Sequence, residues 1–145
     1  MKKVNSAKRV IVRGQTEGPV VATTIPLSFW GGFNPQTGEI VDKHHPLYGH
    51  NIADSVFVIP YGRGSSTSSG VLLEAILTGH APRVILLAEI DEIIALGAIV
   101  ADEMFSKRLP VLVLDAQTFQ QALQASYARI HENGDVIFPE CLFPA

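Results

Sequence analysis

The residues best suited to chemistry form one short stretch, Tyr61 to Gly70, in which glycines flank an arginine and a run of hydroxyl side chains. Arg63 lies between two of the glycines, and five Ser or Thr residues follow. The stretch separates an apolar run typical of a strand, Val56 to Pro60, from one typical of a helix, Val71 to Leu77. A helix beginning in such a loop directs backbone N–H groups and its positive dipole end at the loop, which favours an anionic ligand.

The same loop could activate a serine. An Oγ that becomes alkoxide-like is stabilised by N–H donors and by a cation such as Arg63. The ordinary alternative is a helix cap, for which Ser and Thr are preferred, but a cap uses one side chain and this loop has five hydroxyls. The order of residues matches neither the Walker phosphate loop nor the nucleophile elbow of hydrolases. An anion-binding loop and a loop with an activated serine both stay open from these residues alone.

Three histidines, His44, His45 and His50, lie in another short segment. Adjacent histidines point in different directions in most backbones, and no carboxylate or cysteine lies at ligand spacing. We interpret them as hydrogen-bonded or solvated loop residues rather than metal ligands or acid–base groups. No complete set of nucleophile, base and orienting group is recognisable. A self-contained hydrolase with Ser65 as nucleophile would need a histidine at hydrogen-bond distance.

The segment from Ile25 to Gly38 combines turn-forming residues with the large rings of Phe29, Trp30 and Phe33. Such a loop is expected to fold over something rather than extend into solvent. We expect the three rings to be packing residues, with any ring edge that faces the serine loop shaping a pocket there.

The elements that must position these residues follow from apolar patterning and capping signals. Asn133-Gly134 between two β-like runs predicts a terminal hairpin, and Asp115 is an expected helix N-cap. The fold class is therefore α/β, a layered β/β/α domain with the serine loop at the carboxyl end of a central strand. Strands are expected at 8–13, 19–24, 56–59, 83–88, 110–114, 128–131 and 135–138, and helices at 71–77, 91–105 and 115–126.

Composition limits the class of protein. The chain has 145 residues, 47% hydrophobic and 17% charged, which favours a single domain spanning residues 1–145. A net charge of −3 without a long basic run argues against a nucleic-acid partner.

The polar start and the lack of a long apolar run argue against export and a membrane span, so a cytoplasmic setting is expected. The single Cys141 cannot form an intrachain disulfide or hold an iron–sulfur cluster alone. A mean hydropathy of +0.24 favours apolar surface covered by a partner over the alternative, a dense β core in a self-sufficient monomer.

Two motifs, in this order, resemble the small subunit of the aconitase X family. The first runs from Pro26 to Gly38, and the second comprises His45 to Leu47 followed by Pro60 to Ser65. The resemblance extends from about Gly18 to Leu114 and implies an aconitase swivel-like domain detached from the rest of the enzyme.

The resemblance also implies that two subunits have different roles in the reaction. In this family a larger subunit carries the iron site and its cysteines, and the swivelling subunit supplies a serine across the interface. The base serine is the first of a Gly-Ser-Ser pair, which places it at Ser65 here. Ser65 would abstract the proton α to the substrate carboxylate, while iron in the partner acts as Lewis acid on the leaving hydroxyl. No metal ligand is expected in this chain. The residues expected to hold the carboxylate and shield the site are Arg63, Gly64, Ser66, Ser28, Trp30, Gly31 and Gly32.

The substrate is expected to be a small carboxylate. Aconitase proper has Arg-Glu after its serine pair, whereas Thr67-Ser68 here favours a monocarboxylate over a tricarboxylate. Bacterial members of aconitase X resemble cis-3-hydroxy-L-proline dehydratases, which yield a pyrroline-2-carboxylate, and archaeal members resemble phosphomevalonate dehydratases. The continuation from Ser66 to Gly70 resembles the bacterial type. The alternatives are a phosphomevalonate dehydratase small subunit and a non-catalytic anion-binding or regulatory subunit.

Overall fold

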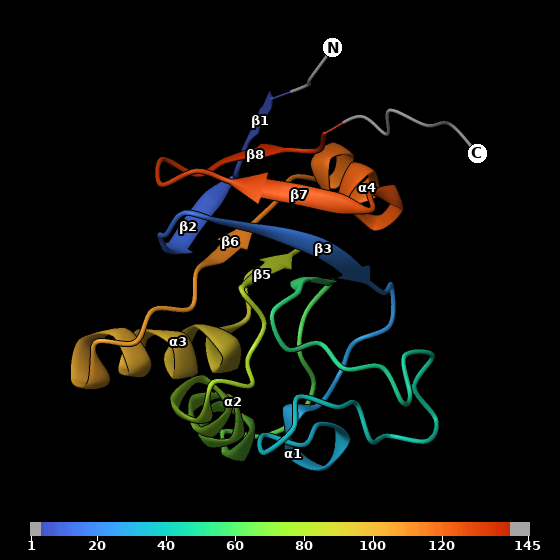
Figure 1. Cartoon of the computed structure of the whole chain (residues 1–145), viewed down its shortest axis with the longest axis vertical. Helices are drawn as coiled ribbons and strands as arrows, with labels where there is room; N and C mark the ends of the chain where they lie inside the picture. Colours follow the sequence, from blue (N-terminus) through green and yellow to red (C-terminus); the bar gives the residue numbers. More distant parts are fainter. Residues whose placement is uncertain (1–3, 140–145) are drawn as a thin grey trace.

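The chain folds around one twisted eight-stranded sheet (Figure 1). The computed structural model describes residues 4–139, so Cys141 lies outside the described part. None of the helices within residues 4–139 has the length and apolar character needed to cross a membrane. The strands are β1 (Val4–Ser6), β2 (Arg9–Val12), β3 (Thr16–Ala22), β4 (Val56–Ile59), β5 (Val84–Leu87), β6 (Val111–Val113), β7 (Tyr127–Ile130) and β8 (Asp135–Ile137); the helices are α1 (Phe29–Gly32), α2 (Thr67–Thr78), α3 (Glu92–Phe105) and α4 (Ala116–Gln124).

The long strand β3 belongs to two sub-sheets. Its first half, Thr16–Pro19, pairs antiparallel with β7, which continues into β8 and β1. Its second half, Val20–Ala22, pairs parallel with β4, which continues into parallel β5 and β6 and then antiparallel β2. In Figure 1, β7, β8 and α4 lie above β3, and α2 and α3 lie below the β4–β5–β6 strands. The expected layered arrangement of the α/β class is confirmed.

The central strands are buried on both faces, because short apolar runs without polar alternation suit a sheet covered on two sides. Residues in β4, β5 and β6 are buried throughout. Phe57 and Ile59 pack with Leu72 and Ala98 from the helices, whereas Val56 and Val58 face the cluster that includes the terminal hairpin and α4. The alternation of side chains along a strand thus divides the core into two layers.

Local sequence signals set most element ends. The Asp91 and Asp115 side chains accept backbone N–H bonds at the starts of α3 and α4. Gly79 ends α2 in the left-handed conformation with φ of 82°. The terminal hairpin turns at Gly134, whose φ is 95°. The predicted Asp115 cap and the predicted Asn133-Gly134 turn are confirmed.

Three expectations about elements differ from the structure. The helix after the serine loop begins at Thr67, not Val71, so residues 67–69 form its first turn, in which the Ser69 hydroxyl donates to the Ser66 carbonyl. The segment expected to be a loop contains the four-residue α1, of which Trp30 and Gly31 have non-helical backbone angles. The strand β1, at Val4–Ser6, was not expected; its pairing with β8 is a long-range contact that local pattern does not encode.

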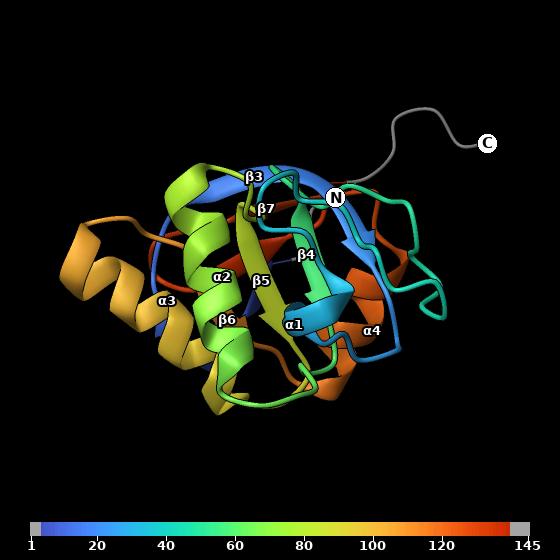
Figure 2. The ribbon, with the colours of Figure 1, turned by 90° about the horizontal axis from the view of Figure 1, so that it is seen from below.

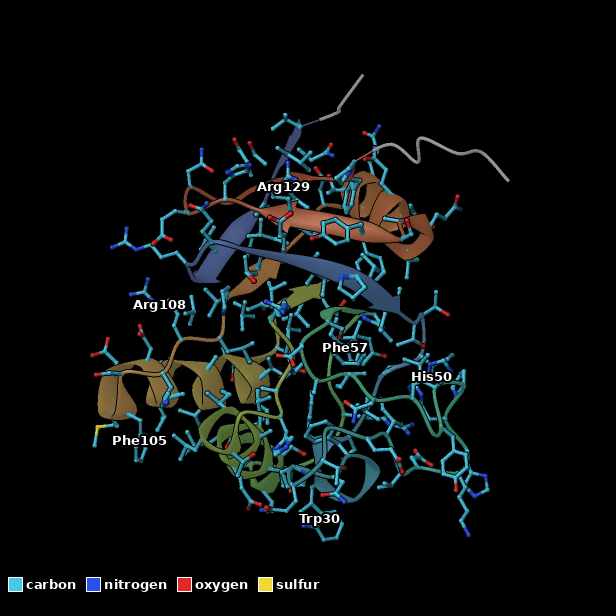
Figure 3. All side chains as sticks on the ribbon, viewed as in Figure 1. Trp30, His50, Phe57, Phe105, Arg108 and Arg129 are labelled. Carbon is cyan, nitrogen blue, oxygen red and sulfur yellow. The ribbon has the colours of Figure 1, made fainter. Side chains whose placement is uncertain are left out.

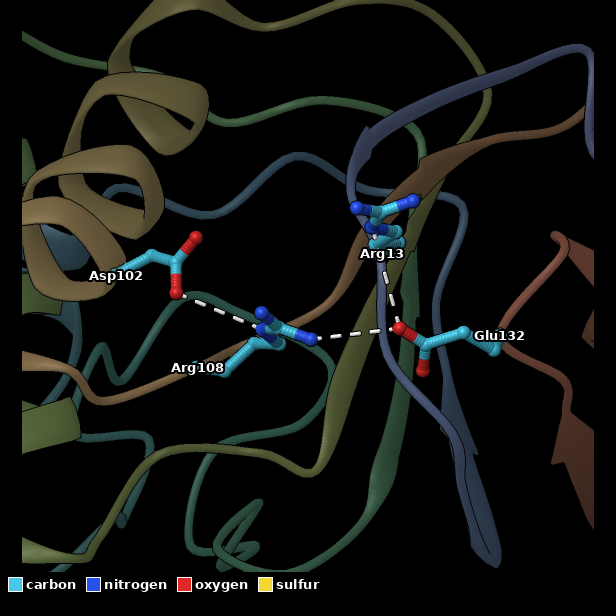
Figure 4. Close-up of polar contacts among 4 residues, drawn as sticks. All are labelled: Arg13, Asp102, Arg108 and Glu132. Carbon is cyan, nitrogen blue, oxygen red and sulfur yellow. Dashed lines mark hydrogen bonds and ion pairs between the residues drawn. The ribbon is translucent and has the colours of Figure 1, made fainter.

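A chain of ion pairs crosses the sheet edge at which β6 begins and the antiparallel β2 ends (Figure 4). Glu132, in the β7–β8 turn, lies 3.4 Å from Arg108 and 4.0 Å from Arg13, and Arg108 lies 3.5 Å from Asp102 of α3. These side chains are partly exposed, so the pairs contribute little to the free energy of folding. The serine loop lies at the opposite edge of the sheet.

Candidate active site

The serine loop leaves the carboxyl end of β4 and leads into α2. Because β4 lies between parallel β3 and β5, the loop lies at the central part of the sheet edge where α/β proteins bind ligands. Seen from below, α1 lies beside the loop that enters α2 (Figure 2). The side chains of Ser65 and Ser66 are exposed at the N-terminus of this twelve-residue helix.

The hydroxyl of Ser65 is held weakly. Its Oγ accepts a bond from the Thr67 N–H at 3.4 Å, which is long for a hydrogen bond. The Ser65 carbonyl accepts the Ser68 N–H at 2.9 Å, so the first turn of the helix closes on this residue. Ser66 makes no side-chain capping bond, and its carbonyl accepts the Ser69 hydroxyl at 2.6 Å. The arrangement leaves an exposed hydroxyl at the positive end of a helix, where an anion or alkoxide is stabilised.

Gly64 has a conformation and an environment that only glycine satisfies. Its φ is 115°, and an added Cβ would lie 2.7 Å from Ser28 Oγ and 3.1 Å from Ser68 Oγ. A side chain here would be strained and would separate the serine loop from its neighbours. The sharp turn at Gly64 therefore brings the loop against Ser28.

The Ser28–Gly32 segment packs directly on the serine loop. Leu27 pairs with Gly62 in a parallel bridge, and the Arg63 N–H donates to the Leu27 carbonyl at 3.0 Å. Gly31 has a φ of 82° and is exposed, whereas Gly32 is buried. The structure thus brings residues 28–32 and 62–68 into one surface.

The aromatic residues of this segment differ in role. Phe29 is buried and makes edge contacts with Phe33 and Phe57, with ring centroids 5.3 and 6.5 Å apart. Trp30 is 60% exposed, and its ring points outward from the fold (Figure 3). The interpretation of Trp30 as a packing residue was therefore wrong, because its backbone turns toward Gly31 and directs the ring to the surface.

Asp91 was missed by sequence reasoning and belongs to this site. One carboxylate oxygen accepts the Ile93 and Ile94 N–H groups at 2.9 Å, and the other accepts the Gly62 N–H at 2.7 Å. Its N-cap position directly before α3 was a visible signal, but the bond to Gly62 depends on how β4 and β5 lie together. Asp91 fixes the beginning of the serine loop to the start of α3.

The hollow between these groups is small. Its volume is about 20 Å³, enough for roughly one water molecule. The described residues therefore do not enclose a substrate on their own, since ligand pockets are on the order of 300 Å³ or more. Its lining comprises Phe29, Gly62, Arg63, Gly64, Ser68, Asp91, Ile93 and Ile94.

The histidines lie apart from Ser65. His45 is 4% exposed; its Nε2–H donates to the Ile25 carbonyl at 3.1 Å and its Nδ1 accepts the Leu47 N–H at 3.1 Å, which assigns the Nε2–H tautomer. His44 and His50 are exposed. Among residues 4–139, no hydrogen bond joins a histidine to Ser65, and no group of three His, Cys, Asp or Glu side chains could hold a metal ion. The donor set of the described residues does not fit an iron site.

Comparison with known proteins shows which class this layered domain with a serine loop belongs to. The chain belongs to the aconitase X swivel domain family, whose model matches residues 5–138. The crystal structure of Thermococcus kodakaraensis aconitase X in its holo-form superposes with a TM-score of 0.80 at 31% identity, covering 97% of this chain and 99% of that one.

Curated relatives fall into two groups of dehydratases. The cis-3-hydroxy-L-proline dehydratase of Pseudomonas aeruginosa is 47% identical over 84% of this chain, and that of Hypocrea jecorina is 42% identical over 83%. This chain spans only 20–21% of the length of these two relatives. The phosphomevalonate dehydratase small subunit of Methanothermobacter thermautotrophicus is 45% identical over 64% of this chain and 71% of its own length.

Proposed function

We propose that this chain is the small subunit of a dehydratase that converts cis-3-hydroxy-L-proline to a pyrroline-2-carboxylate, with Ser65 as the base. The observation that carries this proposal is the exposed Ser65 hydroxyl at the N-terminus of α2, in a swivel domain of the aconitase X family. The similarity to two hydroxyproline dehydratases extends over 83–84% of the chain, which favours that substrate.

The reaction removes a proton and a hydroxyl from neighbouring carbons. Ser65 takes the proton α to the carboxylate, the electrons of that C–H bond form a carbon–carbon double bond, and the hydroxyl leaves as hydroxide. The proton that Ser65 has taken then passes to the hydroxide, which gives water and restores the base. Tautomerisation of the enamine then gives the pyrroline. A serine acts as base only where its alkoxide is stabilised, and the dipole of α2 supplies part of that stabilisation.

The substrate carboxylate is assigned to the surface formed by the two packed segments. Exposed backbone around Gly64 and the N–H groups that open α2 suit an oxyanion, and Arg63 adds a positive charge two residues before the base. The Ser28–Gly32 segment, with Trp30 at the rim, covers one side of this surface. These roles are proposals for Arg63, Gly64, Ser66, Ser28, Trp30, Gly31 and Gly32.

A larger partner subunit is part of the proposal. It would hold the iron or iron–sulfur group, because residues 4–139 offer no matching donor set, and it would close the substrate pocket that this chain leaves open. The matched region is only 20–21% of the hydroxyproline dehydratase relatives, which supports a partner that corresponds to the remaining four fifths of their length.

The first experiment is capture of partners with this chain from its native extract, followed by assay of the captured complex. Pyrroline formation from cis-3-hydroxy-L-proline with a larger iron-containing protein supports the proposal. Activity only on mevalonate 5-phosphate would identify this chain as a phosphomevalonate dehydratase small subunit instead. The similar length of such a small subunit, of which the match covers 71%, supports this alternative. Capture of nothing would favour a non-catalytic anion-binding role.

Ser65→Ala then tests the residue. With Ser65 as base, kcat falls about 10²–10⁴-fold while the fold stays intact. Thr67→Ala is the matched control, because it removes an exposed hydroxyl from the same turn and should leave kcat unchanged. A modest change in kcat with weaker binding in Ser65→Ala would instead indicate that the loop only holds an anion. Labelling of Ser65 by a fluorophosphonate would point to the hydrolase alternative.

A further inference from the structure

The buried hydroxyl of Ser68 has no part in the proposed chemistry, yet it joins the two segments of the site. Ser68 is 3% exposed and lies one helical turn after Ser65. Its Oγ accepts the backbone N–H of Trp30 at 3.2 Å, a contact across 38 residues of chain. Ser68 therefore bonds to both segments: its own N–H donates to the Ser65 carbonyl, and its hydroxyl holds Trp30.

Trp30 is held from its other side as well. The Ser28 hydroxyl donates to the Trp30 carbonyl at 2.8 Å. Ser28 Oγ and Ser68 Oγ also approach the same side of Gly64, where an added Cβ would lie 2.7 and 3.1 Å from them. The two hydroxyls thus bind the N–H and the carbonyl of one residue and place it against the turn that precedes Ser65.

The backbone of Trp30 needs such support. Within α1 its ψ of 120° is not helical, and the next residue, Gly31, has a φ of 82°. This short segment makes no regular helical turn at that point, and the Trp30 ring gains little from packing, being 60% exposed. Without the two hydroxyl bonds, Trp30 and Gly31 would be held mainly through their buried neighbours Phe29 and Gly32.

We propose that Ser68 is a positioning residue that holds the Trp30 backbone on the serine loop, while Ser28 fixes the turn at Trp30 within its own segment, and that the two hydroxyls so keep the Ser28–Gly32 segment over the substrate site. The geometric part concerns this chain alone. The effect on turnover rests on the proposed function, because it requires a substrate held beneath the segment.

The test uses a probe already present, because Trp30 is the sole tryptophan of the 145-residue sequence. In Ser68→Ala the fluorescence anisotropy of Trp30 in the full chain should fall and its emission should shift to the red. Ser28→Ala should produce the same change, because it releases the other end of the same residue. The control is Ser55→Ala, which removes an equally buried hydroxyl, 3% exposed, that donates to the Ile52 carbonyl away from the site.

In the complex with the partner, Ser68→Ala should raise KM about tenfold or more with a smaller change in kcat, since a misplaced binding segment weakens substrate capture. Ser65→Ala should instead lower kcat. Ser55→Ala can lower the melting temperature as Ser68→Ala does, but it should leave both the anisotropy and KM unchanged. The split between KM and kcat thus separates positioning from a general loss of stability.

Unchanged Trp30 anisotropy in Ser68→Ala and Ser28→Ala would overturn the proposal. If Ser68→Ala does not fold, Ser28→Ala decides alone by the same measurement, because Ser28 is only half-buried. If the wild-type complex shows no dehydratase activity, the proposed function fails, but the anisotropy of the free chain still decides whether the two hydroxyls hold Trp30 in place.

Discussion

Asp91 shows how one carboxylate can connect two elements of a site. It accepts three backbone N–H groups, two at the start of α3 and one from Gly62 at the start of the serine loop. A carboxylate at a helix N-terminus is stabilised by the helix dipole, and charge-assisted bonds are stronger than neutral ones. The position of the serine loop therefore depends on a residue that takes no part in the proposed proton transfer.

Two substitutions of Asp91 separate its capping role from its loop contact. Asp91→Asn keeps an oxygen that can cap Ile93 and Ile94, but it presents an NH₂ group to the Gly62 N–H. We expect the free energy of unfolding to fall by about 1–3 kcal/mol from this one lost bond. Asp91→Ala should lower the free energy of unfolding by about 1 kcal/mol more than Asp91→Asn, because the helix cap is lost as well. Urea denaturation measures both differences.

Activity in the complex distinguishes loop positioning from capping. Because the Gly62 contact is lost in both variants, we expect Asp91→Asn to lower kcat/KM nearly as much as Asp91→Ala, despite its smaller loss of stability. Glu92→Gln is the control, since Glu92 is exposed in the same helical turn and contacts neither segment of the site. Activity of Asp91→Asn equal to the wild type would mean that the Gly62 contact does not position the loop.

At the scale of elements, the close packing of α2 against α3 sets where Ser65 lies. The two helices approach at Gly97, where an added Cβ would lie 2.8 Å from the Ser69 carbonyl and 3.4 Å from a Leu72 methyl group. Ser69 belongs to the first turn of α2, the turn that Ser65 begins. The helix–helix distance and the placement of the base are therefore coupled.

Gly97→Ala tests this coupling. Alanine favours a helix by about 1 kcal/mol over glycine, but the clash with a backbone carbonyl cannot be relieved by rotating a side chain. We expect a net loss of about 1–3 kcal/mol in unfolding free energy and a lower kcat/KM. Gly70→Ala is the matched control: no heavy atom lies within 4 Å of its added Cβ, so it should be neutral or slightly stabilising. Equal behaviour of the two variants would contradict the coupling.

How far the elements follow from sequence depends on the range of the interactions. Apolar runs, the Asp115 cap and the Asn133-Gly134 turn predict the central strands, α4 and the hairpin, because these signals act within a few residues. The family resemblance, rather than these local signals, predicts that Ser28 and Ser65 share a site. It does not find Asp91 or Ser68 as partners of the site, since their bonds join residues 29 and 38 positions apart. Such contacts appear only once the strands and helices are arranged.

At the scale of the whole molecule, β3 divides the protein into two regions with different tasks. The half paired with β4 supports the serine loop, α2 and α3, whereas the half paired with β7 carries the terminal hairpin. Glu17 and Arg129 are directly opposite on β3 and β7, and the Glu17 carboxylate accepts bonds from Arg129 and from the Tyr127 hydroxyl, each at 3.1 Å. This cluster joins the hairpin region to the rest without touching the site.

The cluster predicts a pH dependence of stability that is independent of activity. The hydrogen bond from Arg129, followed by that from Tyr127, lowers the pKa of Glu17 below its ordinary value of 4.5. A carboxyl whose pKa is lower in the folded than in the unfolded state stabilises the fold at pH values above its unfolded-state pKa. This contribution is lost as the pH falls through its folded-state pKa.

Glu17→Gln should therefore be less stable than the wild type at neutral pH, and the difference should shrink below about pH 4.5. Urea denaturation between about pH 7 and pH 3 measures it. Because Glu17 lies outside the site, kcat/KM of the complex should not change; a stability difference that stays constant with pH would show that packing, not the charge of Glu17, joins the two regions.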